Sequence, residues 1–415
     1  MSKHVPVNVL YCESNMDGTI GGSHYCLLHL VENLDRTRFR PIVVFFEQHA
    51  LIPAFQKVAE TIIRTPYAPV RWSSGKATLT TWPLVLARRV VNLVKFVLAV
   101  AEHISFLKRH RIALVHQNNS ITRHRVWMCA ALLARVPCVA SERGLNSSYN
   151  VWDRFYAATL ALIIPMSRWI MDHLVERGVS PGNIRVMYDG VDPDAITITQ
   201  SPEALRQAYG IRPEQVVVGI VGNIREWKGQ ETVVRALIEV VKVHPEVVCM
   251  FVGAATPGDK AYADRLHMMI EEAGIKRNVR FTGYQSNPAN FVNIMGFVIH
   301  ASVLPEPFGM VVLEAMVQRK AVIGSRAGGV IEMVVEGVTG YTFPPGDTAM
   351  LSIHMLELLG NPELAARMGE AGYERLIRLF TLRRYMEEIH ASYDAILREQ
   401  PVPKQIGIAP HGVAG

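Results

Sequence analysis

Several motifs that mark common chemistries are missing from this sequence. Its five cysteines form no C-x-x-C pair and no repeated spacing, so we expect neither a zinc cluster nor a disulfide framework. The H-E-x-x-H motif and the nucleophile elbow are absent, and Gly75–Lys76 lacks the spacing of a P-loop. We therefore expect buried thiols in a reducing compartment and none of these chemistries.

The sequence also lacks a targeting segment and a long apolar run. Its first residues, MSKHVPVNVLYCE, enter a strand pattern without the apolar core of a signal peptide. In residues 79–111, Arg88, Arg89 and Lys95 interrupt the apolar run before it reaches the roughly 18 residues of a membrane span. We therefore expect a cytoplasmic protein.

Acidic residues are scarce in one region. Residues 1–190 hold 22 Lys/Arg against 12 Asp/Glu, whereas the remaining residues hold 21 against 25. Within residues 61–141, Glu102 is the single acid beside twelve basic residues. This imbalance predicts a polyanionic neighbour, namely nucleic acid, an anionic membrane or a lipid phosphate, unless it is only a solvated basic face.

The basic region contains a predicted amphipathic helix within residues 79–111. Its apolar residues recur at helical spacing, at Leu86, Val90, Leu93, Val94, Val97, Leu98 and Ala101. Two interpretations stay open. The helix packs on its own sheet, or it docks on anionic lipid with Trp72, Trp82, Arg88 and Arg89 at the surface.

Strand-like apolar runs alternate with helical patterns along the chain. They lie at 7–11, 41–46, 61–65, 113–117, 137–141, 162–166 and 184–188, and then at 216–222, 246–253, 279–283, 296–301 and 320–325. This alternation predicts an α/β protein with two doubly wound parallel sheets. We assign residues 1–190 to an N-terminal domain, 191–201 to a linker, 202–380 to a C-terminal domain, 381–398 to a last helix and 399–415 to a disordered tail.

The segment EPFGMVVLEAM places seven residues between Glu306 and Glu314. An apolar strand pattern precedes it, and a helix pattern follows that opens near Gly309. Free N–H groups at a helix N-terminus attract anions, and Glu314 would lie about 7 Å from such an anion. The spacing suits a diphosphate with a ribose at Glu314 and a sugar at Glu306. The alternative is a solvated glutamate pair beside a turn.

This motif resembles the E-x7-E signature of the retaining family 4 glycosyltransferases. Further segments match that family in the same order: GTIGGS (18–23), residues 167–192, GNIREWKGQETVVRAL (222–237) and AGGVIEMVVEGVTGYTFPPGD (327–347). The resemblance implies the GT-B fold, with two Rossmann-like domains facing across a cleft and a last helix that packs back on the first. It also implies retaining transfer of a sugar from a nucleotide-diphosphate-sugar to a glycan or lipid-linked acceptor, in cell-surface polysaccharide or glycolipid synthesis.

The resemblance further implies roles for individual residues. Glu306, Lys228, Arg225 and His116 would be catalytic; Gly21, Gly22, Asn223, Phe308, Gly309, Met310 and Glu314 would bind the donor; and Arg143 would bind the acceptor. Two positions depart from the family pattern. Asn223 replaces its usual arginine, which Arg225 is expected to substitute, and Asn118 replaces the second histidine of its H-x-H. A structural role for His116 is therefore as consistent with the sequence as a catalytic role.

The remaining predictions concern partners and alternatives. Asp192 and Asp194 form a D-x-D, but it lies in the predicted linker, so we expect no metal cofactor. The expected partners are the donor, the acceptor and an anionic membrane at residues 79–111, on the inner face of the plasma membrane, and not nucleic acid. A non-catalytic nucleotide-sugar-binding protein and a GT-B nucleotide-sugar epimerase remain alternative functions.

Overall fold

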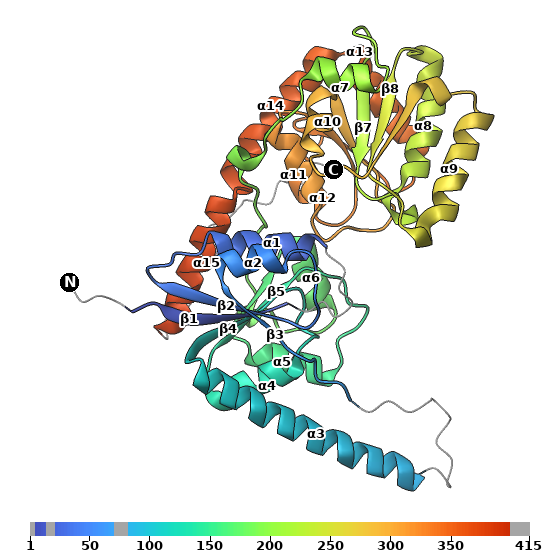
Figure 1. Cartoon of the computed structure of the whole chain (residues 1–415). Coiled ribbons are helices and arrows are strands. Elements are labelled where there is room, and N and C mark those ends of the chain that lie inside the picture. The colour runs from blue at the N-terminus through green and yellow to red at the C-terminus, as the bar shows by residue number, and fades with distance from the viewer. Residues whose placement is uncertain (1–4, 14–20, 70–81, 399–415) are drawn as a thin grey trace. The chain divides into compact units, whose positions relative to one another are not determined.

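The computed structural model describes residues 5–13, 21–69 and 82–398, apart from the side chains of residues 82 and 83, and forms two α/β units (Figure 1). Unit 1 contains the described residues up to 166, residues 170–187 and the chain from 386 onward. Unit 2 contains residues 167–169 and 188–385. Each unit is built on a six-stranded parallel sheet. The predicted α/β class with two doubly wound sheets is confirmed.

The sheet of unit 1 has the strand order β3-β2-β1-β4-β5-β6. Its strands are β1 (Val7–Cys12), β2 (Phe39–Phe45), β3 (Glu60–Ile63), β4 (Ile112–Gln117), β5 (Cys138–Glu142) and β6 (Leu162–Pro165). Its helices are α1 (Gly22–Glu32), α2 (Ile52–Val58), α3 (Trp82–Arg109), α4 (Arg125–Ala134), α5 (Val151–Thr159), α6 (Arg168–Glu176) and the end of α15 (Leu382–Leu397). The last helix is held by Asp394, which pairs with Arg38 at 2.6 Å, and by His390, which stacks on Phe39 of β2.

The sheet of unit 2 has the order β12-β11-β10-β7-β8-β9. Its strands are β7 (Val217–Val221), β8 (Val248–Val252), β9 (Val279–Gly283), β10 (Phe297–His300), β11 (Ala321–Ser325) and β12 (Gly340–Phe343). Its helices are α7 (Pro202–Ala208), α8 (Gln230–Val243), α9 (Lys260–Glu272), α10 (Ala289–Ile294), α11 (Met310–Val317), α12 (Val330–Met333), α13 (Thr348–Gly360) and α14 (Pro362–Leu379). Short 3-10 turns connect several of them, including Glu226–Lys228 before α8.

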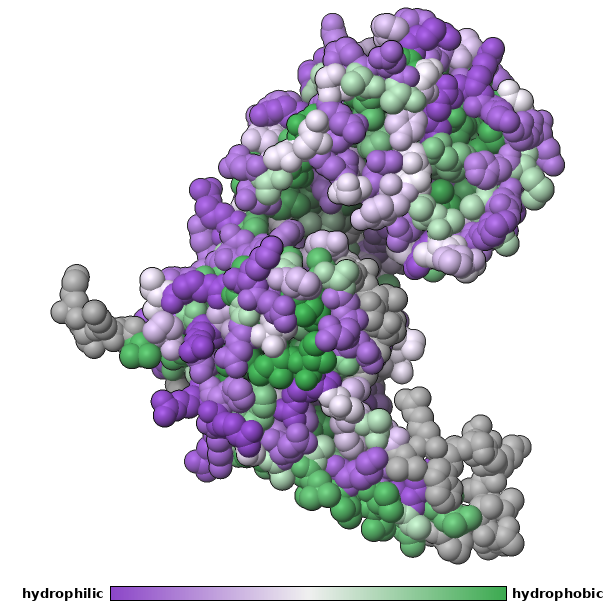
Figure 2. Space-filling view, in the orientation of Figure 1, coloured by the Kyte–Doolittle hydropathy of each residue, from purple (hydrophilic) through white to green (hydrophobic). Residues whose placement is uncertain are grey.

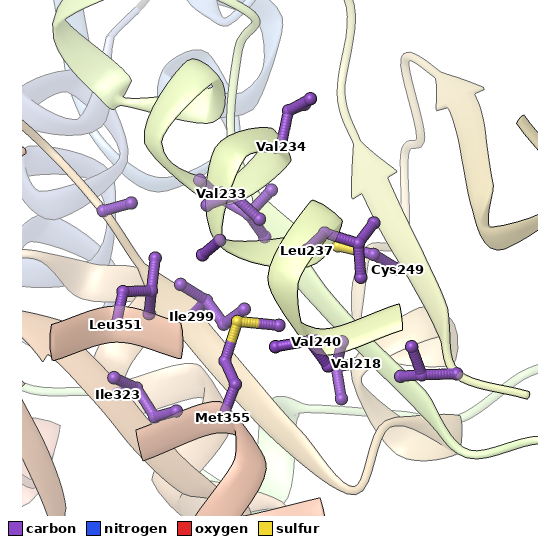
Figure 3. Packing of buried hydrophobic residues seen from close by; sticks show 14 of the residues in the cluster. Val218, Val233, Val234, Leu237, Val240, Cys249, Ile299, Ile323, Leu351 and Met355 are labelled. Carbon is purple, nitrogen blue, oxygen red and sulfur yellow. The ribbon is translucent and has the colours of Figure 1, made fainter. Parts of the chain in front are cut away.

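The core of unit 2 lies between α8, α13 and the sheet. In Figure 3, Val233, Leu237 and Val240 of α8 are grouped with strand residues and with Met355 of α13, and all of them belong to one buried cluster. Valine and isoleucine suit the strands because their branched side chains pack well on a pleated surface. Burial of each such side chain stabilises the fold by about 1.5–3 kcal/mol. The core therefore holds in place the strand ends at which the loops of the candidate site begin.

Two details differ from the predicted strands. Residues 184–188 are not a strand. The backbone N–H groups of Arg185 and Met187 donate hydrogen bonds to carbonyl groups of β6. Only one isolated bridge forms, between Ile163 and Ile184. In contrast, β12 was not predicted. Its four residues, GYTF, are too few and too polar for the alternation to be recognised.

Helix α3 confirms the predicted helix but not the interpretation in which its apolar stripe packs on the sheet. Leu86, Val90, Leu93, Val94, Val97, Leu98 and Ala101 are all exposed. The side that packs inward carries other residues, including the buried Val100, His103, Phe106 and Leu107. Trp72 and the predicted tail at 399–415 lie outside the described residues, as does the side chain of Trp82.

Each sheet has a point at which its strand order reverses. In unit 1 this switch point lies between β1 and β4, and in unit 2 it lies between β7 and β10. Ligands of open parallel sheets bind beyond the carboxyl ends of the strands at such a point. The loop after β7 carries Lys228 and the loop after β10 carries Glu306, so both emerge at the switch point of unit 2.

Candidate active site

The centre of the candidate site is the carboxylate of Glu306. Its Oε1 accepts a hydrogen bond from Lys228 Nζ at 2.6 Å, from His300 Nε2 at 3.0 Å, and from the Ser302 hydroxyl. Burial alone would raise the pKa of Glu306. The hydrogen bond and electrostatic interaction with His300, together with the positive charge and hydrogen bond of Lys228, outweigh this effect and lower the pKa well below 4.5. Glu306 is therefore ionised at neutral pH.

His300 and Ser302 were not among the predicted site residues. His300 is the last residue of β10, and Ser302 follows two residues later; both side chains are buried. His300 Nδ1 is buried without a hydrogen-bond partner, so Nε2 is the nitrogen that fixes the carboxylate. Polar residues at the carboxyl end of an apolar strand, as in VIHAS, were the available signal.

Glycines hold the two loops of the site against each other. Gly229, which follows Lys228, has φ +73°, and a Cβ there would lie 1.9 Å from the carbonyl oxygen of Ala301. The backbone N–H of Val303 also donates to the carbonyl of Trp227 at 2.8 Å. A larger residue at 229 would separate these loops, so the glycine keeps Lys228 within reach of Glu306.

The glycine pair 328–329 supports the Glu306 loop from its other side. A Cβ at Gly328, where φ is +66°, would lie 2.0 Å from the carbonyl oxygen of Glu306, and one at Gly329 would lie 2.6 Å from that of Pro307. Gly329 N–H also donates to the Glu306 carbonyl at 2.9 Å. The G-G-x-x-E segment thus positions the backbone of Glu306.

The predicted helix after Gly309 is α11, and Gly309 is its N-cap with φ +103°. Met310 is the first helical residue, and N–H groups at this end have no intrahelical partner. Phe308 is buried against Tyr188 and Phe380, so its side chain is structural and its backbone is the part near the helix start. The N-terminus of α11 is thus an electropositive end beside Glu306.

Glu314 lies in the second turn of α11. Burial raises the pKa of its carboxyl above 4.5. Among the described residues, no hydrogen bond or ion pair holds this side chain. The side chain is half-buried, and a carboxylate accepts hydrogen bonds, so hydroxyl groups such as those of a ribose diol would suit it.

The loop after β7 carries the other predicted donor residues of unit 2. Arg225 Nε lies 3.2 Å from Asp259 Oδ2, although without hydrogen-bond geometry, and does not contact Glu306. Asn223 is exposed, and its carbonyl accepts a hydrogen bond from Gln230 at 2.9 Å. Of the two predicted cations, Lys228 is therefore the one that the structure joins to Glu306.

The predicted residues of unit 1 lie around its own switch point. Gly21 is the N-cap of α1 and Gly22 its first residue, and a Cβ at either position would meet no atom of the described residues within 4 Å. Residues 18–20 of that loop lie outside the described part of the chain.

His116 is the next-to-last residue of β4 and is buried. Its Nδ1 bonds to the hydroxyl of Tyr393 and its Nε2 to that of Ser141 at 2.8 Å. Burial and the nearby charge of Arg143 lower the pKa of His116 to about 3, so the ring is neutral. Since both ring nitrogens are engaged, these contacts favour the structural interpretation of His116.

Arg143 belongs to a polar cluster that joins three strand ends. Its Nε donates to Asn118 Oδ1 at 3.1 Å, and Asn118 Nδ2 in turn donates to Glu13 at 2.5 Å. These residues follow β5, β4 and β1 respectively. Asn118, which replaces a histidine of the family pattern, thus bridges a cation and a carboxylate.

Two further acidic groups have structural roles. Glu332, from the G-G-x-x-E segment, accepts hydrogen bonds from the backbone N–H groups of Arg168 and Trp169, both at 2.9 Å, and from Tyr188 at 2.8 Å. It therefore caps the start of α6. Asp192 accepts a hydrogen bond from the N–H of Asp194, and in the described residues no group of three or more potential ligands could hold a metal.

Comparison with known proteins gives two matches along the chain. The model of "Glycosyltransferase Family 4" matches residues 20–195, and that of "Glycosyl transferases group 1" matches residues 201–375. A lipopolysaccharide core biosynthesis mannosyltransferase from Rhizobium leguminosarum is 31% identical over 215 residues, which are 51% of this chain and 60% of that one. An N-acetyl-alpha-D-glucosaminyl L-malate synthase from Bacillus anthracis is 25% identical over 62% of this chain and 65% of its own length.

Solved structures share the fold over nearly the whole chain. An Anabaena protein, Alr3699/HepE, in complex with UDP has a TM-score of 0.78 at 22% identity, covering 94% of this chain and 100% of its own. A glycosyltransferase from Rickettsia africae has a TM-score of 0.78 at 19% identity, with 95% and 100% covered. The expected GT-B fold is thereby confirmed. The two family matches, which together extend over most of the chain, place it among the group 1 glycosyltransferases of family 4.

Proposed function

We propose that the chain transfers a sugar from a nucleotide-diphosphate-sugar to a glycan or lipid-linked acceptor with retention of configuration. The observation that carries this proposal is the cluster at the switch point of unit 2, where an ionised Glu306 lies 2.6 Å from Lys228 at the start of α11. Charge stabilisation of a departing diphosphate is the main need of such a reaction, and a cation beside a helix N-terminus supplies it.

Each residue of the cluster has a proposed task. Lys228 and the N–H groups of Gly309 and Met310 bind the diphosphate, Glu306 accepts hydrogen bonds from sugar hydroxyls, and Glu314 accepts them from the ribose. In the free protein Lys228 neutralises Glu306, so an arriving diphosphate competes for the same ammonium group. Arg225 and Asn223, on the same loop, complete the diphosphate end.

The proposed reaction forms one bond and breaks one. The bond between the anomeric carbon and the diphosphate oxygen breaks, and a bond to the acceptor oxygen forms on the same face. The acceptor proton passes to the diphosphate. No side chain is required as a nucleophile, and we propose that no metal takes part. The acceptor is proposed to contact Arg143 in unit 1, with Gly21 and Gly22 near the donor.

The curated relatives suggest the biological setting. One is described as acting in lipopolysaccharide core biosynthesis, and UDP-glucose is bound in a structure of the Anabaena protein. We therefore propose a role in cell-surface polysaccharide or glycolipid synthesis, with a UDP-sugar as the first donor to test. A reducing compartment such as the cytoplasm suits the five cysteines, all within the described residues, none of which forms a disulfide.

The test is a turnover assay with a panel of nucleotide sugars, with and without lipid-linked and soluble glycan acceptors. We expect release of the nucleoside diphosphate to depend on the acceptor, and the product to keep the donor's anomeric configuration. Conversion of the donor without any acceptor would show an epimerase instead. Donor binding without turnover, unchanged in Glu306→Ala, would show a non-catalytic binding protein.

A further inference from the structure

Helix α3 turns an apolar side to solvent. Eight large apolar side chains of this helix are between 47 and 64% exposed, namely Leu84, Leu86, Val90, Val91, Leu93, Val94, Val97 and Leu98. We call this set the α3 face. Figure 2 shows hydrophobic residues gathered along the helix. A surface helix of a globular protein ordinarily turns its polar side outward, so the α3 face has the opposite character.

The opposite side of α3 is already occupied by its own unit. Tyr67 packs edge-on against Phe96 and donates a hydrogen bond to the carbonyl of Asn92. Further along, His103 and Phe106 contact Trp127 of α4. These contacts fix the rotation of the helix about its axis. The α3 face is therefore an outer surface of unit 1 and not part of its hydrophobic core.

The charges along the α3 face are of one sign. Between residues 84 and 101 the helix carries Arg88, Arg89 and Lys95 and no acidic residue. The first acid is Glu102, which pairs with Arg64. An apolar face with basic residues beside it is the pattern of a helix that lies in the interface of an anionic bilayer.

We propose that the α3 face docks the chain on the surface of an anionic lipid bilayer, with Arg89 and Lys95 at the headgroups. A second copy of the chain is a poorer occupant, because two α3 faces would bring only positive charges together along these segments. No helix in the described ranges has the length and apolarity to span a bilayer, so the contact is with one leaflet. The inference is independent of the proposed function, although it would bring the site to lipid-linked acceptors.

The test is flotation of the full chain with vesicles, either of equal parts phosphatidylglycerol and phosphatidylcholine or of phosphatidylcholine alone. We expect the wild type to float with the anionic vesicles at about 10 mM salt and to be released as the Debye length falls from about 30 Å to about 8 Å near 150 mM. Leu93→Glu/Val97→Glu should lower the bound fraction at least about tenfold. Arg89→Gln/Lys95→Gln should lower it by about tenfold and abolish the preference for anionic lipid.

Matched controls come from unit 2. Val243 and Met268 are 63 and 58% exposed, close to Leu93 and Val97, and Val243→Glu/Met268→Glu should leave flotation unchanged. Circular dichroism confirms that each variant keeps its helices; should the glutamate variant unfold, the Arg89/Lys95 variant still decides the question.

Three results would overturn the proposal. The first is that the wild type does not float with anionic vesicles at low salt. The second is that the unit 2 control loses as much binding as the α3 variant. The third is that the wild type does not bind vesicles and light scattering shows it to be a dimer, which Leu93→Glu/Val97→Glu converts to a monomer. The proposed function is tested separately by a thermal shift with nucleotide sugars. If the α3 variants lose vesicle binding but keep this thermal shift, their donor binding is intact, so failure of the membrane proposal is distinguished from failure of the proposed function.

Discussion

The two units share one topology but use the switch points of their sheets differently. In unit 1, His116, Asn118 and Arg143 bond to neighbouring side chains of the same unit. In unit 2, Glu306 is held ionised beside Lys228, and Glu314 is half-buried with no bonding partner in the described residues. These side chains of unit 1 are joined to one another, whereas those of unit 2 include the pair that we propose to meet a charged, hydroxyl-rich ligand. This difference is the reason why we propose that the sugar donor binds in unit 2.

The largest expected effect comes from removing the charges of unit 2. Lys228→Ala and Glu306→Gln should each lower the rate of transfer by about 10²–10³-fold, because stabilisation of the leaving group or of the sugar is lost. The measurement is kcat/KM with the donor found in the nucleotide-sugar panel. Lys242→Ala is the matched control, since Lys242 pairs with Glu239 on the exposed side of α8. Equal losses in Lys242→Ala would contradict the assignment.

A second prediction tests how the loops of unit 2 are joined. Gly229→Ala should reduce the free energy of unfolding by roughly 3 kcal/mol, because the new methyl group meets the Ala301 carbonyl in addition to the strain of positive φ. Gly274→Ala is the control: φ there is +68° but no atom lies within 4 Å, so the loss should be roughly 1 kcal/mol. Urea denaturation measures both. Equal losses would show that backbone strain alone matters at 229.

A third prediction concerns the half-buried carboxyl group of Glu314. Glu314→Gln should weaken binding of the cognate nucleoside diphosphate by about tenfold, since a charged acceptor of ribose hydroxyls becomes neutral. Calorimetric titration with the ribo- and 2′-deoxyribonucleotides gives a double-mutant cycle. Loss of the 2′-hydroxyl should cost affinity in the wild type and much less in the variant. Additive losses would remove Glu314 from the ribose.

The last prediction concerns a buried carboxyl group in unit 1. Glu142 is buried and accepts the backbone N–H of Ile121 at 2.8 Å; burial raises its pKa to about 8. From pH 4.5 to 8 the folded state therefore holds a proton that the unfolded state has lost, and stability falls as pH rises through this window, by at most about 1.4 kcal/mol per pH unit. Glu142→Gln should flatten this slope in denaturant titrations between pH 5 and 8, whereas the exposed control Glu203→Gln should not. A wild-type slope that persists in Glu142→Gln would contradict this account.

Local sequence patterns predicted the fold, and in unit 2 they also indicated the elements that carry the candidate site. The strands from β7 to β11 were expected from apolar runs, and α11 begins after Gly309 as the sequence indicated. The reason is physical: buried strands and helix starts depend on residues that are adjacent in the chain. Lys228 beside Glu306 followed from the resemblance, because both lie on loops at adjacent strand ends.

What the sequence did not reveal depends on contacts between distant segments. The bonds of His116 to Tyr393, and of Glu332 to the start of α6, join residues far apart in the chain. Helix α3 illustrates the same limit. Its periodicity predicted an apolar face, but apolar residues occur on both sides, and only the packing of Phe96 and Phe106 shows which side is inward.

The most direct test of the site in unit 2 is a crystal structure of the chain with its cognate nucleotide-diphosphate-sugar. We predict the diphosphate within hydrogen-bond distance of Lys228 and the first N–H groups of α11, the ribose at Glu314 and the sugar at Glu306. A donor bound at the β1 and β4 ends of unit 1, with the Lys228–Glu306 pair intact and uncontacted, would contradict this assignment.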